Sequence, residues 1–203
     1  MKKINLLAIG LLLLALQTIN AQDSYTSTKT FGADNVPIRE LRTMGITGNM
    51  GWNGLTGFGI SLNSFITGNM EIDAGVGLSS TGFKFGARYN YLFSMKKFSP
   101  FVAAGFMYGT GSGAELKSPS TGNNSFNYII KASPFAQIVG GFEYMSKGGF
   151  LLKADAGYAI LLVDNNYEIS SGSPGSDDLR AMDMAFGSGI VLELSIGYAW
   201  GGK

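Results

Sequence analysis

Eight charged residues with the potential to do chemistry share one side of a repeating two-residue pattern. In stretches such as 82–93, aromatic or aliphatic residues recur at every second position and polar residues fill the positions between them. Successive side chains of a strand point to opposite faces, so these charges should share one face of a sheet. They are Glu71, Asp73, Lys84, Arg88, Glu143, Lys153, Asp155 and Glu193, with Arg42 as a further candidate. Acidic and basic groups on one face predict a network of ion pairs.

Several kinds of catalytic chemistry lack their usual residues. The chain has no His, the common general base near neutral pH. It has no Cys, which excludes disulfides, thiolate metal sites and cysteine nucleophiles. No paired-carboxylate motif stands out either. We therefore expect no enzyme activity, no catalytic residue and no cofactor.

The segment 163–180 is the one candidate for a metal site. It carries Asp164, Glu168, Asp177 and Asp178 against the single basic residue Arg180, and calcium binds oxygen clusters of this kind. However, the spacing and the glycine of an EF-hand loop are missing. The sequence favours a solvated acidic loop, and we expect no metal.

The N-terminus has the features of an export signal. Lys2 and Lys3 precede an apolar stretch, 4–16, and Ala21 offers a small residue for cleavage before Gln22. We expect 1–21 to be removed and 22–39 to form a polar lead-in. Cleavage would leave 13 basic residues against 14 acidic ones, and this balance gives no reason to expect a nucleic-acid partner.

The composition is apolar on average without long apolar runs. Charged residues make up 14% of the 203 residues, against about 25% in ordinary soluble domains. Mean hydropathy is +0.16. Outside the N-terminus, no window approaches the roughly 18 uninterrupted apolar residues of a transmembrane helix. This combination favours membrane-spanning strands over membrane-spanning helices.

The alternation predicts eight strands, joined by connections of unequal length. Short turns at 67–69, 94–97 and 146–149 fall on one side, and the longer loops 110–125 and 163–181 fall on the other. An even strand number, with short turns on one side and long loops on the other, is typical of bacterial outer-membrane barrels. We expect the strands at 40–47, 56–66, 70–78, 82–93, 100–109, a stretch ending at Met145, 150–162 and 182–200.

The faces opposite the charges indicate which side of the barrel meets lipid. From the second strand to the eighth, these faces carry no charged residue. A water-soluble barrel such as a lipocalin would have to bury the charged face as its interior, which is costly. Aromatic residues also gather near strand ends, where a spanning barrel meets the lipid headgroups. This predicted aromatic belt contains Phe93, Phe98, Tyr108, Tyr144, Phe150, Tyr198 and Trp200.

The last strand carries a partial sorting signal. Ser195-x-Gly197-x-x-Trp200 resembles the C-terminal signal read by the outer-membrane assembly machinery, although its final hydrophobic position is occupied by Gly202, followed by Lys203. The chain from about Glu40 to Trp200 resembles the small outer-membrane barrels of the OmpA and OmpX kind. No peptidoglycan-binding domain is seen after Trp200, unlike the two-domain members of that family.

The resemblance and the alternation together predict an all-β fold, an eight-stranded antiparallel up-and-down transmembrane β-barrel over residues 40–203. They imply a monomer in the cell outer membrane, with lipid, lipopolysaccharide and the assembly machinery as partners. An eight-stranded barrel is just wide enough for its own side chains to fill. We therefore expect a polar lumen plugged by ion pairs, with a narrow porin-like channel through inward glycines as the alternative. A structural or adhesive role through loops 110–125 and 163–181 fits best, since function often sits on loops over a rigid scaffold.

Overall fold

The computed structural model describes residues 37–118 and 125–201. The predicted signal peptide, nearly all of the polar lead-in and Gly202 of the sorting signal lie outside these residues. Within residues 37–118 and 125–201, no helix has both the length and the apolar content needed to span a bilayer.

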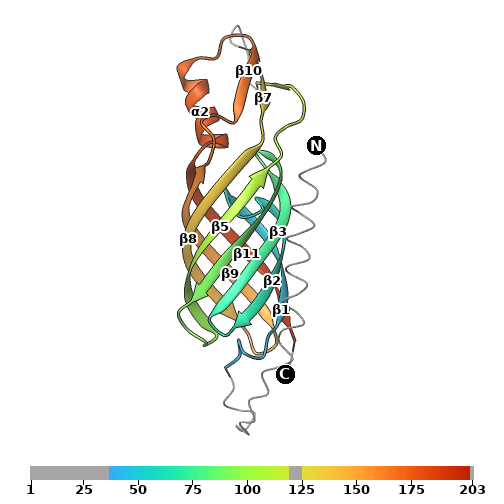
Figure 1. The fold of residues 1–203 in the computed structure, drawn as a ribbon, viewed down its shortest axis with the longest axis vertical. Coiled ribbons are helices and arrows are strands. Elements are labelled where there is room, and N and C mark those ends of the chain that lie inside the picture. The colour runs from blue at the N-terminus through green and yellow to red at the C-terminus, as the bar shows by residue number, and fades with distance from the viewer. Residues whose placement is uncertain (1–36, 119–124, 202–203) are drawn as a thin grey trace. The chain divides into compact units, whose positions relative to one another are not determined.

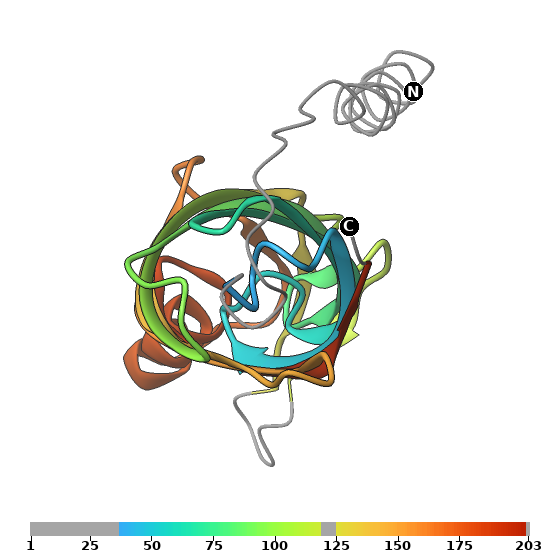
Figure 2. The ribbon, with the colours of Figure 1, turned by 90° about the horizontal axis from the view of Figure 1, so that it is seen from below.

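Eight antiparallel strands close into a barrel (Figures 1 and 2). Each barrel strand pairs with the barrel strand before it and the one after it along the chain. Pairing of the first barrel strand with the last closes the sheet. The predicted all-β, eight-stranded up-and-down barrel is therefore confirmed, as is the fold that the resemblance implied. The strands are β1 (Met44–Trp52), β2 (Phe58–Thr67), β3 (Met70–Ser79), β4 (Gly82–Leu92), β5 (Phe98–Gly109), β8 (Ser133–Met145), β9 (Phe150–Leu161) and β11 (Gly189–Trp200).

A second, smaller unit of structure extends one end of the barrel, and we call it the cap (Figure 1). It contains a three-stranded sheet of β6 (Leu116–Lys117), β7 (Asn127–Ile130) and β10 (Tyr167–Ser171), together with the helix α2 (Ser176–Phe186). Its own apolar cluster holds the sheet and helix together. The cluster consists of Phe126, Ile130, Met182 and Phe186, with Tyr128, Tyr167, Ile169 and Ala185 packed against it.

The cap corrects three sequence predictions. The stretch 110–125 was expected to be a loop but contains β6. The stretch 163–181 was expected to be a loop but contains β10 and the first half of α2. The last strand was expected to begin at residue 182 but begins at Gly189, because Met182 to Phe186 complete the helix. Met182 and Phe186 lie four residues apart, a spacing that suits one helix face as well as one strand face. Both are buried in the cap cluster.

The first strand also differs from its predicted position. It was expected at 40–47 and lies at Met44–Trp52, because the preceding residues form tight turns. The amide of Glu40 donates to the carbonyl of Pro37 at 3.0 Å, and the amide of Arg42 donates to that of Arg39 at 3.3 Å. At the other end, residues 48–52, which lie beyond the predicted strand, pair in register with β11 as far as Trp52.

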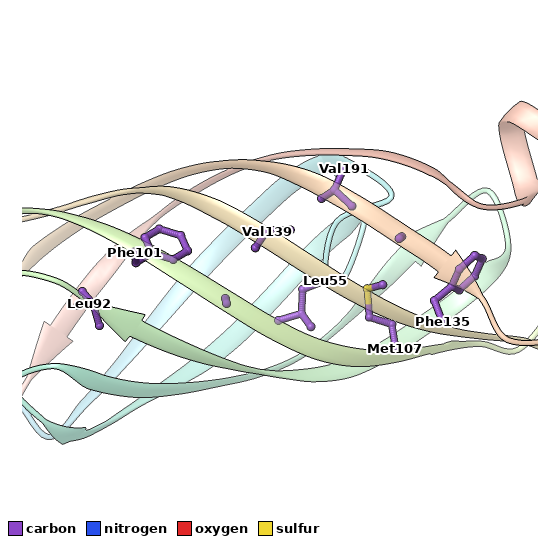
Figure 3. Close-up of a cluster of buried hydrophobic side chains, with 9 residues drawn as sticks. Leu55, Leu92, Phe101, Met107, Phe135, Val139 and Val191 are labelled. Carbon is purple, nitrogen blue, oxygen red and sulfur yellow. The ribbon is translucent and has the colours of Figure 1, made fainter.

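The inside of the barrel holds apolar side chains as well as charged ones. Near one end, Phe65, Met145, Leu151 and Ala199 form a buried cluster. A second cluster spreads along the lumen, as Figure 3 shows for Leu92, Phe101, Val139, Met107 and Phe135. The inward face is therefore mixed, with the charged residues lying among apolar layers.

Candidate functional site

The register of the strands brings opposite charges together on the inward face. Asp73 on β3 lies directly across from Arg88 on β4, and Glu143 on β8 lies across from Lys153 on β9. Since directly opposed residues of an antiparallel pair are the closest cross-strand neighbours, these positions favour ion pairing. Asp155 and Glu193 are also directly opposed, on β9 and β11, so they need a shared cation.

Lys153 is the cation that several carboxyl groups share in the half of the lumen away from the cap. Its Nζ donates to Oε1 of Glu71 at 2.6 Å and to both carboxylate oxygens of Asp73 at 3.1 Å. The same nitrogen lies 3.4 Å from Oε2 of Glu143. All four side chains are 2% exposed or less. One ammonium group on β9 thus joins three carboxyl groups from two other strands, β3 and β8.

Arg88 is the cation of the half nearer the cap. Its guanidinium lies 3.1 Å from Glu193, 3.2 Å from Asp155 and 3.5 Å from Asp73. Asp73 therefore contacts both Arg88 and Lys153 and links the two halves of the network. Asn63 and Asn90 also donate to Asp73, at 2.6 and 2.8 Å.

The structure places seven of the eight predicted network residues in this one cluster, and Lys84 apart from it. Lys84 is 2% exposed, yet no ion pair joins it to a carboxylate within residues 37–118 and 125–201. Its Nζ donates to the carbonyl of Gly54 at 2.8 Å and lies 5.4 Å from the ring centre of Phe135. Lys84 therefore holds a loop in place.

Arg39 is a network member that the sequence reading missed. It lies in the turn before β1, is 1% exposed and forms an ion pair with Glu143. Its Nε also donates to the carbonyl of Lys96 at 3.1 Å. Arg42 was the expected further cation, but its guanidinium instead donates to the carbonyl of Lys147 at the barrel end. The segment around Arg39 has no two-residue period, so the local pattern did not place this residue in the lumen. The one sequence signal for a further cation was that acidic residues outnumber basic residues on the inward face.

Residues 53–57, between β1 and β2, form what we call the plug loop, because this connection folds into the barrel. Leu55 and Thr56 are fully buried. Figure 3 shows Leu55 inside the lumen, among the cluster that includes Met107 and Val139. The amide of Leu55 donates to Oε2 of Glu193 at 2.6 Å. Together with the bond from Lys84 to Gly54, this contact anchors the loop to the charged interior.

The other end of the lumen is occupied by the turn before β1. Ile38 packs against the cluster of Phe65, Met145, Leu151 and Ala199, next to the buried Arg39. In Figure 2 the blue segment that begins at residue 37 crosses this opening. Side chains thus fill the lumen at three levels, namely this turn, the ion-pair network and the plug loop.

The inward glycines do not leave obvious free space. A Cβ added at Gly75 would lie 2.5 Å from Cγ2 of Thr56. One added at Gly141 would lie 2.7 Å from Cβ of Asp155. These glycines let the plug loop and the charged side chains fit within the barrel, so they give no support to a path for ions.

The residues of the predicted aromatic belt lie on the outward face. Across neighbouring strands, Phe98 lies opposite Tyr144, and Phe150 lies opposite Tyr198. These rings, like those of Phe93 and Trp200, are exposed, at values from 37% to 58%. Tyr108, at the cap end, is half-buried and packs 5.4 Å from the ring of Phe85.

The acidic residues of the 163–180 segment are spread over the cap. Glu168 forms an ion pair with Lys131 at 2.8 Å, and the hydrogen bond and charge of Lys131 hold the pKa of Glu168 below its usual value. Asp178 accepts the amide of Gly175 at the start of α2, at 2.9 Å. In the part of the chain that the structure describes, no three His, Cys, Asp or Glu residues are grouped as a metal site requires.

A buried asparagine fastens the cap to the barrel rim, and an exposed hydrogen bond joins β10 to α2 within the cap. Nδ2 of Asn166, which is 1% exposed, donates to Oγ of Ser133 on β8 at 3.0 Å and to the carbonyl of Phe186 at 2.7 Å. The hydroxyl of Tyr167 donates to Asp183 of α2 at 2.7 Å. Desolvation and this hydrogen bond raise the pKa of Tyr167 to about 12.

No protein-family model and no curated protein matches the chain. Among solved structures, it is similar to the N-terminal β-barrel domain of Pseudomonas aeruginosa OprF, with 14% sequence identity and a TM-score of 0.42. The match covers 76% of this chain and 95% of that domain. The fold of this protein accordingly stands on its own strand pairing.

Proposed function

We propose that this protein is an outer-membrane barrel that does not conduct ions and that presents its cap as a surface for interaction. One observation carries the proposal. Every charged residue of the eight barrel strands faces inward and is buried, and no outward position of those strands is charged. Water outside this barrel would meet a continuous apolar face, whereas lipid would match it.

The large exposed fractions of apolar side chains on the outward face support the membrane assignment. Ile138 is 70% exposed, Phe58 is 71% exposed and Leu78 is 63% exposed, each on a different strand. Soluble monomers rarely expose contiguous apolar patches larger than a few hundred Å². The export signal predicted at 1–21 and the partial sorting signal ending at Trp200 agree with delivery to the outer membrane.

The cap is the part that we propose faces the cell exterior. Outer-membrane barrels have short turns on the periplasmic side and longer connections outside. Here the turns that join β2 to β3, β4 to β5 and β8 to β9 are short and lie at one end of the barrel. The opposite end carries the cap. Lipopolysaccharide would then surround the cap end, and a partner would meet the cap sheet and α2.

The filled lumen favours a scaffold over a narrow channel. An ion would have to pass Arg39, the network around Lys153 and Arg88, and the buried Leu55 in turn. Catalysis is not part of the proposal, because the chain has no His and its buried carboxyl groups are held in ion pairs. Turnover of a lipid or peptide by the purified protein, abolished by one carboxylate substitution, would contradict this.

The test is conductance of the protein purified from outer membranes and inserted into planar bilayers at neutral pH. Insertion is verified separately by heat-dependent mobility in gel electrophoresis, and a known porin provides the positive control. We expect no conductance steps from folded, inserted protein. Reproducible steps would favour the narrow channel, and recovery of the protein in the soluble periplasmic fraction would refute the membrane assignment itself.

A further inference from the structure

The charges buried in the lumen do not balance. Five carboxyl groups face four cations, and all nine residues are 7% exposed or less. An uncompensated charge in such surroundings is very unfavourable, and a buried group usually neutralises instead. The carboxyl groups are those of Glu71, Asp73, Glu143, Asp155 and Glu193, and the cations are Arg39, Lys84, Arg88 and Lys153.

The imbalance lies in the half of the lumen away from the cap. Nearer the cap, Asp155 and Glu193 share Arg88. The second cation of this half is Lys84, which bonds to the plug loop that also contacts Glu193. In the other half, three carboxyl groups, on Glu71, Asp73 and Glu143, share Lys153. Arg39 adds a second cation, and it contacts Glu143. This half is therefore short of one positive charge.

The geometry singles out Glu71 and Glu143. Both contact the Nζ of Lys153, at 2.6 and 3.4 Å, so one ammonium group holds the two carboxyl groups close together. Oε2 of Glu71 and Oε2 of Glu143 have no donor among residues 37–118 and 125–201. Two ionised carboxylates cannot donate to each other, so a hydrogen bond between them requires a proton.

We propose that Glu71 and Glu143 form a proton-binding site, in which Glu71 carries the proton and donates it to Oε2 of Glu143. Glu71 is the holder because Lys153 is its only cationic contact among residues 37–118 and 125–201, whereas Glu143 contacts both Lys153 and Arg39. The ionised Glu143 then keeps its attraction for Arg39, which sits in the turn that fills this end of the barrel. The bound proton makes the charges of the lumen balance.

The two glutamates serve different purposes in this arrangement, and isosteric substitution separates them. In Glu71→Gln, the amide oxygen still accepts from Lys153, and the amide nitrogen can donate to Glu143 as the protonated carboxyl does. The matched control is Glu193→Gln, at another buried inward glutamate. Glu193 accepts from Arg88 and from the amide of Leu55, so it needs its charge and both oxygens. The inference concerns the lumen alone and does not depend on what the cap binds.

The first measurement is the infrared spectrum of the folded wild-type protein in detergent at neutral pH. We expect the carbonyl stretch of a protonated carboxyl group, and its loss in Glu71→Gln but not in Glu193→Gln. The second measurement is the urea midpoint of unfolding. It should be unchanged in Glu71→Gln and lowered in Glu193→Gln.

Any one of five results would overturn the inference. The wild-type spectrum could lack a protonated carboxyl group, or keep it in Glu71→Gln. Glu71→Gln could also lose as much stability as Glu193→Gln, or fail to fold where Glu193→Gln folds. A stoichiometric metal ion in the purified wild type, without the protonated-carboxyl band, would show that a metal cation supplies the missing charge.

Discussion

Replacing Arg88 by Leu tests whether the ion-pair network stabilises the barrel. The guanidinium of Arg88 is 1% exposed and contacts Glu193, Asp155 and Asp73 at 3.1 to 3.5 Å. Leucine fills part of the same space without a charge. The substitution therefore removes the contacts while leaving the carboxyl groups buried, which is the costly way to break an ion pair.

The magnitude follows from what each carboxyl group retains. Asp73 keeps Lys153 and the amide donors of two asparagines, and Glu193 keeps the amide of Leu55. Asp155 keeps no ion pair in the part of the chain that the structure describes, and neither of its oxygens accepts a hydrogen bond there. Orphaning one buried carboxylate typically costs about 3–5 kcal/mol. We expect a loss of that size in the free energy of unfolding.

The assay is reversible urea unfolding in phospholipid vesicles, followed by the fluorescence of the two tryptophans, Trp52 and Trp200. Adding Asp155→Asn to Arg88→Leu should restore part of the loss, because the orphaned charge is removed. Arg88→Leu that unfolds like the wild type would refute the stabilising role. A double variant no more stable than Arg88→Leu would refute the assignment of the loss to Asp155.

Three further substitutions test other parts of the molecule. Ile138→Arg, on the outward face near the middle of β8, should lower stability in vesicles by about 2–4 kcal/mol and would be tolerated if water surrounded the barrel. Leu55→Ala should lower the free energy of unfolding in urea by about 2–5 kcal/mol. An unchanged free energy of unfolding would show that the plug loop does not pack in the core. The pKa of Tyr167 in the folded protein is about 12, above the usual value of about 10. The contribution of Tyr167 to the free energy of unfolding should therefore be complete below pH 10 and be lost as the pH rises toward 12. Tyr167→Phe should remove this pH dependence from urea unfolding, and an unchanged profile would contradict the hydrogen bond to Asp183.

The barrel could be predicted because its signal is local and repeated. Alternation of apolar and polar residues fixes which side chains share a face, whatever the partner strand. The inward charges could be identified in this way, but their partners could not, because pairing depends on the register between strands. Lys84 illustrates the limit. Its face was predictable, whereas its bond to the carbonyl of Gly54 depends on a loop that enters from the barrel end.

Residues outside the strands were predicted least well, for a related reason. Arg39 lies in a turn with no period, so nothing local indicated that it would enter the lumen. In 182–186, spacings of two and four residues coexist, and both Met182 and Phe186 could belong to a strand or a helix. Burial against Ile130 of β7, a contact far away in sequence, stabilises the helix.

The plug loop shows how the narrow lumen determines residue type beyond the strands. The backbone of Gly54 and Leu55 lies between Lys84 and Glu193, which bond to it from opposite walls. A Cβ at Gly54 would lie 2.9 Å from Cδ of Glu193, so a side chain there would push the carboxylate away from the amide of Leu55. The next residue, in contrast, must be large and apolar to fill the space among Met107, Phe135 and Val139. A sequence that looks like a surface turn, Asn-Gly-Leu-Thr-Gly, is therefore constrained at Gly54 and Leu55 by the interior it enters.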